Sequence, residues 1–150
     1  MKARLLALAA TLLLPLAALA QLPAPYTATY EVRRNGDVLG TATVDFRALP
    51  GGRFELHSHT VGSEGLAAIA GVDLDERSTL RLADGAPETV AYDYRQKMAW
   101  KSKSRALRVD ADARRIRYTD KGRDYAPPYR PGVLDRNAIT VALRSSTPDR

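Results

Sequence analysis

His57 and His59 are the residues of this sequence whose type and spacing most directly suggest chemistry. Residues i and i+2 of a β-strand point to the same face, so two imidazoles at this spacing can share a Zn²⁺ or Cu²⁺ ion. A metal site needs a third or fourth ligand, and Glu55 is the nearest candidate on the same face. The alternative is two polar residues on the wet face of a sheet. Because no third ligand is fixed by the pattern, we predict no cofactor.

Ser58 and Ser63 lie near these histidines in the sequence, which raises the hypothesis of a Ser–His–Asp hydrolase. The sequence contains no Gly-x-Ser-x-Gly elbow, no Gly-rich phosphate loop and no His-Glu-x-x-His motif. It contains no cysteine, which excludes cysteine nucleophiles and thiolate metal sites. We therefore keep a metal-assisted or serine hydrolase only as a third hypothesis.

A set of aromatic side chains shares the strand phase expected of inward-facing residues. Such side chains can line an apolar cavity for an acyl chain or a sugar face. The alternative is an ordinary β core, where aromatic residues are favoured. The candidate ligand-binding residues of this set are Tyr30, Phe54, Tyr92, Tyr94 and Trp100, the last in phase with Met98.

Residues 1–20 have the three parts of a cleaved secretory signal peptide. Lys2 and Arg4 form a positive start, an apolar run follows, and Ala18 and Ala20 supply the small residues before the cleavage point. We predict cleavage after Ala20, a mature chain of residues 21–150, and a periplasmic location. No later stretch approaches the roughly 20 apolar residues of a spanning helix, so we predict no transmembrane segment in the mature chain.

Charge is unevenly distributed along the mature chain. Residues 21–94 hold six Arg or Lys against eleven Asp or Glu, whereas residues 95–150 hold fifteen against six. Lys101, Lys103 and Arg105 share one strand face in the densest basic stretch, and such a row can meet the phosphates of an anionic lipid or glycolipid. The alternatives are acidic and basic strands that pair across a sheet, and a solvated edge. Predicted export removes nucleic acid from the expected partners.

Short alternating segments separated by turn signals predict the fold. Alternation places strands at 26–32, 38–46, 53–60, 72–82 and 88–95, and a basic hairpin within 97–117 turns near Asp112. Asn35-Gly36 is a strong hairpin signal. Residues 63–70 predict a short helix or turn, and Asp135 is predicted to cap a helix over 136–144. We predict one mainly β domain, a curved antiparallel sheet or partial barrel with one short helical segment and a C-terminal helix.

The order of these features resembles a known family. A signal peptide is followed by Tyr-x-x-x-Tyr-Glu-Val, an Asn-Gly hairpin into Leu-Gly-Thr-Ala, and a Phe-Glu-Leu-His-Ser strand. A Gly/Ala-rich segment, a Ser-Thr-Leu strand, a Pro-rich loop and an Asp-initiated helix complete the series over residues 26–144. This series resembles the bacterial exported family called domain of unknown function 3108. The resemblance implies location and fold, and it transfers no catalytic residue.

The resemblance also has a consequence for the C-terminus. Members of that family continue after the Asp-initiated helix with further strands, whereas this sequence stops at Arg150. We therefore expect either a truncated family member or a sheet that a protein partner completes at an open edge. The family's general appearance is similar to curved-sheet periplasmic carriers of acyl chains, which is an analogy of fold alone.

These observations give two leading hypotheses. The first is a non-enzymatic protein of the cell envelope that binds an amphiphilic or anionic envelope component. The second is a structural or interaction module that completes its sheet with a partner.

Overall fold

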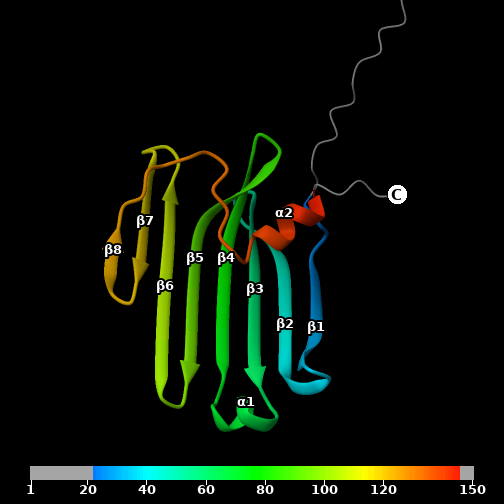
Figure 1. Cartoon of the computed structure of the whole chain (residues 1–150). Helices are drawn as coiled ribbons and strands as arrows, with labels where there is room; N and C mark the ends of the chain where they lie inside the picture. Colours follow the sequence, from blue (N-terminus) through cyan, green and yellow to red (C-terminus); the bar gives the residue numbers. More distant parts are fainter. Residues whose placement is uncertain (1–21, 146–150) are drawn as a thin grey trace, which may run out of the picture.

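A computed structural model describes residues 22–145 (Figure 1). The predicted signal peptide, residues 1–20, lies outside the described residues. Eight strands form one antiparallel sheet in which each strand is hydrogen-bonded to the next along the chain. The elements are β1 (Tyr26–Arg34), β2 (Asp37–Leu49), β3 (Arg53–Gly62), α1 (Gly65–Ile69), β4 (Asp73–Ala83), β5 (Ala86–Met98), β6 (Lys101–Asp110), β7 (Arg115–Asp120), β8 (Arg123–Tyr125) and α2 (Ile139–Ser145).

The predicted fold class is confirmed. The sheet is unclosed over residues 22–145, because its two outermost strands, β1 and β8, are not paired with each other. One short helix and one C-terminal helix accompany it, as the pattern predicted. This unclosed sheet agrees with the predicted curved antiparallel sheet or partial barrel.

Local sequence explains the turns between strands. Asn35 and Gly36 have φ values of 53° and 93°, the left-handed conformations that a tight two-residue hairpin needs. The strands run two or three residues beyond several predicted ends. Trp100 differs from the expectation: β5 ends at Met98, and Trp100 lies in the turn to β6 instead of continuing the strand in phase.

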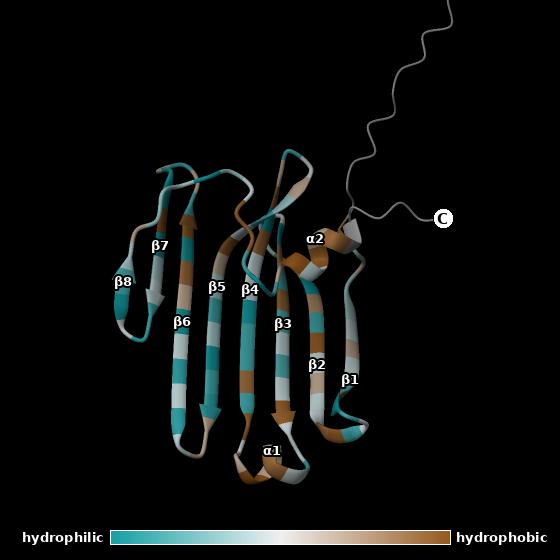
Figure 2. Cartoon of the chain, in the orientation of Figure 1, coloured by the Kyte–Doolittle hydropathy of each residue, from teal (hydrophilic) through white to brown (hydrophobic). Residues whose placement is uncertain are grey.

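The hydrophobic core lies at one end of the sheet, beneath α2. Phe46, Leu56 and Leu80 from three adjacent strands pack with Ala138 and Val141 of the C-terminal segment. Figure 2 shows that α2 is largely hydrophobic and lies at the upper end of the sheet, where hydrophobic and hydrophilic residues alternate along the strands. Aromatic stacking extends this core toward β1, with Tyr26 and Phe54 rings each 5.8 Å from that of Phe46.

Strand alternation gives the sheet two distinct faces. The core face carries Phe46, Leu56 and Leu80 and is the face that α2 covers. The opposite face, which we call the histidine face, carries His57 and His59. No helix within residues 22–145 is both long enough and apolar enough to cross a membrane.

Candidate functional site

The histidine face carries a ladder of polar contacts between neighbouring strands. Thr27 on β1 donates to Asp45 on β2 at 2.6 Å, and Arg47 donates to Glu55 at 2.8 Å. Arg77 on β4 lies 3.6 Å from the same Glu55 carboxylate. The polar residues of this face are therefore matched across the first four strands, as expected for cross-strand pairs.

Each histidine is hydrogen-bonded to an aspartate of β4 that lies two residues before its register partner. His57 lies opposite Arg77 in the register, but its Nε2 is 2.6 Å from Asp75 Oδ2. His59 lies opposite Asp75, and its Nε2 is 3.0 Å from Asp73 Oδ1. The two imidazole rings are stacked at 6.4 Å between centroids. Both Nε2 atoms therefore already have carboxylate partners.

The environment of Asp75 keeps its carboxyl ionised. Partial burial acts to raise the pKa of Asp75, but the hydrogen bond from His57 and the charges of His57, Arg77 and His59 act in the opposite direction. The second group of effects is larger, so the pKa of Asp75 lies below its ordinary value of 3.8. An ionised carboxylate only accepts hydrogen bonds, so His57 Nε2 donates here.

A groove of about 610 Å³ continues the histidine face from β3 toward β6. Its lining comes from β3, β4, β5, β6 and the turn after β7. The lining residues are His59, Asp73, Asp75, Arg77, Arg95, Gln96, Lys97, Ser102, Lys103, Ser104 and Lys121. By strand alternation, the side chains of Gln96 and Lys103 belong to the core face, so they border the groove rather than fill it.

The cations and the carboxylates of this groove differ in how they are partnered. Asp73 and Asp75 are both held by histidines. Among the described residues, Arg95, Lys97 and Lys121 have no salt-bridge partner. Arg95 and Lys97 lie opposite Asp75 and Asp73 in the register, and the lining as a whole carries five Arg or Lys side chains against these two carboxylates. The groove therefore has a net positive charge, with the hydroxyls of Ser102 and Ser104 as additional donors.

The geometry does not assemble the hydrolase that Ser58 suggested. Ser58 points to the core face, where its Oγ donates to Asn137 Oδ1 at 2.9 Å, so it is separated by the sheet from His57. Ser104 shares the histidine face but lies three strands from β3, about 14 Å at the usual spacing of strands. Within the part of the chain that the structure describes, no group of three or more His, Asp or Glu side chains is placed to hold a metal ion.

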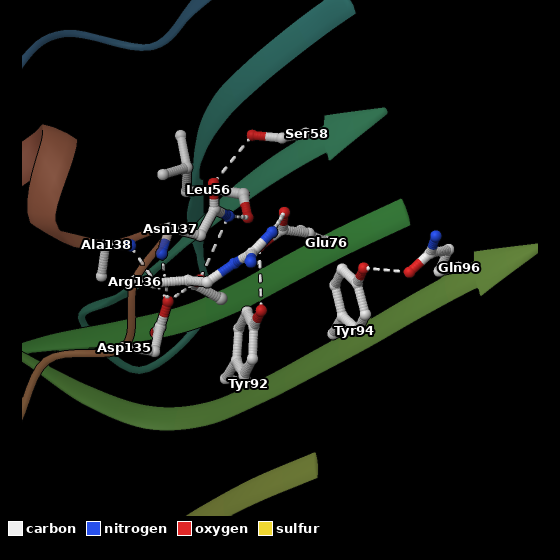
Figure 3. Close-up of polar contacts among 11 residues, drawn as sticks. Leu56, Ser58, Glu76, Tyr92, Tyr94, Gln96, Asp135, Arg136, Asn137 and Ala138 are labelled. Atoms are coloured by element: carbon white, nitrogen blue, oxygen red, sulfur yellow. Dashed lines mark hydrogen bonds and ion pairs between the residues drawn. The ribbon is translucent and has the colours of Figure 1, made fainter. Parts of the chain in front are cut away.

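The core face holds a buried polar network that fixes the C-terminal segment (Figure 3). Asp135 is 6% exposed and accepts hydrogen bonds from the hydroxyls of Ser78 and Thr89, each at 2.8 Å. It also accepts from the backbone N–H groups of Asn137 and Ala138. Asp135 was expected to cap a helix from 136, but these bonds instead fix a turn, and the helix begins at Ile139.

A charged cluster continues this network toward the middle of the sheet. Glu76 accepts hydrogen bonds from the Tyr92 hydroxyl at 2.8 Å and from Arg136, whose Nε is 2.9 Å away. Burial, followed by the hydrogen bond to Glu76, raises the pKa of Tyr92 above its ordinary value of 10.0. The Arg136 guanidinium also lies over the ring of Tyr94, 4.9 Å from its centroid. These contacts show a structural cluster that holds the C-terminal segment on the sheet.

Four of the five predicted aromatic residues lie on the core face, whereas Trp100 lies in the turn between β5 and β6, and the five do not form one cluster. Tyr92 and Tyr94 are buried on β5, and their hydroxyls donate to Glu76 and Gln96 respectively. Phe54 belongs to the core around Phe46, and Tyr30 lies on the outermost strand β1. Trp100 is 71% exposed at the far end of the sheet.

The predicted basic row is divided between two environments. Arg105 donates to Asp120 across β6 and β7 at 3.1 Å and belongs to the core face. Lys101 and Lys103 are on the same face but have no salt-bridge partner among the described residues. Cross-strand pairing, the alternative interpretation, thus applies to Arg105 and to Arg108, which pairs with Asp93 at 2.8 Å.

Sequence reasoning singled out the histidines but missed most of the groove. Arg95, Asp73 and Asp75 were recognisable as strand residues in the phase of the histidines, which is the signal that would have grouped them. Lys121, in the turn between β7 and β8, also lines the groove, and no sequence pattern predicts that this turn approaches it.

No protein-family model, no curated protein and no solved structure matches this chain at a significant level. The function proposed for it therefore depends on the geometry of its own residues.

Proposed function

We propose that this chain is a non-enzymatic binding protein of the cell envelope that holds an anionic molecule, one bearing phosphate or carboxylate groups, in the groove on the histidine face. The observation that carries this proposal is the imbalance within the groove. Its lining carries five Arg or Lys side chains against Asp73 and Asp75, and among the described residues Arg95, Lys97 and Lys121 form no ion pair, although Arg95 and Lys97 lie opposite the two carboxylates in the register. Unpaired cations around a concave surface attract anions and are the usual means of binding them.

The lining suits a phosphorylated or carboxylated sugar or headgroup better than an acyl chain. Arginine and lysine side chains meet phosphate oxygens, and Ser102 and Ser104 can donate to hydroxyls or to phosphate. The large aromatic residues that would receive an acyl chain lie on the other face, where Tyr92 and Tyr94 are buried. We therefore place the ligand's charged part, and not a lipid tail, in this groove.

The proposed location is the periplasm, and the proposed family is domain of unknown function 3108. Both proposals depend on the sequence, through the signal-peptide pattern of residues 1–20 and the order of strands and turns over residues 26–144. An envelope location supplies the anionic ligands that the groove suits, among them phospholipid headgroups and phosphorylated glycans.

Titration with inorganic pyrophosphate tests the groove. We expect chemical-shift changes in the NMR spectrum at Arg95, Lys97, Ser102 and Ser104, and an affinity that falls as salt is added. The Arg95→Gln/Lys97→Gln double variant is expected to weaken binding at least tenfold. Lys101→Gln is the matched control, because Lys101 is an unpaired lysine on the other face, and it is expected to change affinity less than twofold. Equal affinity of the double variant and the parent would exclude the groove as the site.

A second candidate function follows from the open edge of the sheet. Within residues 22–145, β2 is the one strand that pairs with β1, so the outer edge of β1 over residues 28–34 can receive an added strand. We propose strand addition by a second copy as the alternative function. The N–H groups of successive residues in β1 point alternately toward β2 and toward the outer edge. One of the two variants Ala28→Pro and Thr29→Pro therefore removes an N–H on the outer edge and leaves the pairing with β2 intact. Sedimentation should show that the parent chain is a dimer and that this variant is a monomer of unchanged stability. A parent chain that is monomeric at all concentrations excludes this alternative.

A further inference from the structure

The three most exposed large hydrophobic side chains of the described residues lie at one end of the sheet. Leu66 and Ile69 of α1 are 81% and 77% exposed, and Trp100 in the β5–β6 turn is 71% exposed. Figure 1 shows α1 and this turn at the end of the sheet opposite α2. We call these three residues the apolar tip. Isolated exposed apolar residues need no explanation, but a cluster of the largest ones marks an interaction surface.

The apolar tip is held in place by backbone hydrogen bonds. The N–H of Ala99 donates to the carbonyl of Ala70 at 2.8 Å, which joins the β5–β6 turn to the end of α1. The N–H of Ser63 donates to Leu39 on β2 at 3.0 Å, which fixes the start of the same loop. Gly62 allows the close approach, because a Cβ there would lie 2.6 Å from the carbonyl oxygen of Ala67. The exposure of Leu66 and Ile69 is therefore a fixed property of the fold.

The helix α1 is oriented opposite to an ordinary surface helix. Two alanines approach the sheet, since Ala67 is half-buried and Ala70 at its C-terminal end is buried, whereas Ala68 is exposed. Its large apolar residues, Leu66 and Ile69, face outward. A helix that stabilised only this fold would bury its large side chains and expose its small ones. The outward orientation therefore indicates that a partner receives Leu66 and Ile69.

Lysines surround the apolar tip on both faces of the sheet. Lys97 lies on the histidine face, and Lys101 and Lys103 lie on the core face. Within residues 22–145 none of these three has a salt-bridge partner. Two acidic side chains lie near the tip, Glu64 at the start of α1 and Asp73 at the start of β4, where Asp73 is opposite Lys97 in the register. The surroundings are thus net positive, which complements an anionic surface.

We propose that the apolar tip docks into the surface of an anionic lipid bilayer. Leu66, Ile69 and Trp100 enter the boundary between headgroups and acyl chains, and the lysines contact lipid phosphates. Tryptophan favours this boundary because its ring is apolar while its N–H remains hydrated. Each lysine near an anionic surface raises partitioning about fivefold, so the lysines add substantially to the apolar contribution. Binding of this kind strengthens with the apolar area that is buried and with the attraction of basic residues to anionic lipids.

Docking in this orientation also places the groove close to the bilayer. Asp73, Lys97 and Ser102, which line the groove, are at the ends of β4, β5 and β6 nearest the apolar tip. The groove would therefore open beside the headgroups, where anionic ligands are concentrated. The docking proposal does not depend on the groove being a binding site, and each can fail without the other.

Trp100 provides a built-in measurement, because it is the one tryptophan of the sequence. The chain without residues 1–20, which contains every described residue, is mixed with vesicles of phosphatidylcholine or of phosphatidylcholine with about 30% phosphatidylglycerol, an anionic lipid. We expect a blue shift of Trp100 fluorescence and protection from an aqueous quencher with the anionic vesicles only. Added salt should reverse part of the binding.

Variants separate the apolar and the electrostatic contributions. Leu66→Ser/Ile69→Ser should lower the partition coefficient more than tenfold, whereas Leu143→Ser, an exposed leucine on α2, should leave it within twofold. Lys97→Gln/Lys101→Gln should lower partitioning about twenty-fivefold, since each lysine contributes about fivefold. Circular dichroism confirms that each variant is folded, and Leu66→Ser alone replaces the double variant if that fails to fold.

Two outcomes would overturn the proposal. One is a Trp100 spectrum that does not change on addition of anionic vesicles. The other is a blue shift without vesicles that grows with protein concentration, which would assign the apolar tip to contact between copies of this chain. Loss of pyrophosphate binding in Arg95→Gln/Lys121→Gln with unchanged vesicle binding would confirm that the two sites are independent.

Discussion

The core face and the histidine face hold their charged side chains in opposite ways. On the core face Asp135 is buried with four hydrogen-bond donors around it, and Glu76 is enclosed by Arg136 and Tyr92. Over the described residues no buried side-chain polar atom lacks a partner. On the histidine face the groove lining has more basic than acidic side chains, and among the described residues Arg95, Lys97 and Lys121 form no ion pair. Charged side chains on the core face therefore stabilise the fold, whereas cations on the histidine face remain available to bind a ligand.

The sharpest test of this comparison is Asp135→Ala. The substitution leaves the hydroxyls of Ser78 and Thr89 and two backbone N–H groups without their acceptor in a buried site. We expect a loss of about 3–5 kcal/mol in the free energy of unfolding, because unsatisfied buried donors are costly. Urea denaturation measures it. Asp112→Ala, at an exposed turn residue, is the control and should change stability by less than about 0.5 kcal/mol. Similar losses in both variants would contradict the contrast.

An intermediate effect is expected for Glu76→Gln. The Glu76 side chain is 15% exposed, but its partner Arg136 is 56% exposed, so solvent compensates part of the lost ion pair. Glu76 accepts three hydrogen bonds, two of them at Oε2, and an amide oxygen in that place can still accept those two. We expect a loss of about 1–2 kcal/mol in unfolding free energy. Glu31→Gln removes an exposed pair with Arg33 and should cost less than about 0.5 kcal/mol by the same measurement.

The smallest effect is expected on the histidine face, where Asp75→Asn removes the carboxylate that His57 contacts. The pKa of Asp75 is lowered in the folded chain, so the ionised carboxyl stabilises the fold above its ordinary pKa of 3.8. That stabilisation is lost as pH falls through the lowered folded-state pKa. We expect the variant to be less stable by under about 1 kcal/mol at neutral pH and to converge with the parent in acid. Urea midpoints over a pH series measure this, and a gap that widens in acid would reverse the assignment.

The strands were predictable from the sequence because each buries one face. Period-2 alternation and the Asn35-Gly36 turn reported local conformation, and local conformation determined both the pairing and its antiparallel sense. The alternation also correctly placed His57 and His59 on the face of the sheet opposite to that of Leu56. The position of Trp100 was not predictable from phase, because a two-residue turn preserves the apparent alternation while reversing the chain.

The partners of the histidines were not predictable, because they depend on register between strands. Asp73 and Asp75 approach His59 and His57 by a diagonal step that alternation alone does not specify. The same limit applies to Asp135. The local pattern predicted a helix cap, whereas Asp135 fixes a turn and accepts hydrogen bonds from Ser78 and Thr89, which are distant in sequence. Local sequence patterns therefore predicted the strands, whereas the groove could not be predicted because it depends on contacts between strands.

Pairing of strands strictly in chain order affects how the protein reaches its fold. Each hairpin needs only a short loop to close, so strands can join the sheet one after another as the chain emerges from N to C. The segment that covers the core arrives last, because Ala138 and Val141 follow all eight strands. Until then Phe46, Leu56 and Leu80 face water on a nearly finished sheet. The period of greatest aggregation risk is thus the interval before residues 135–141 dock, when a chaperone that binds apolar strands would have the most to protect.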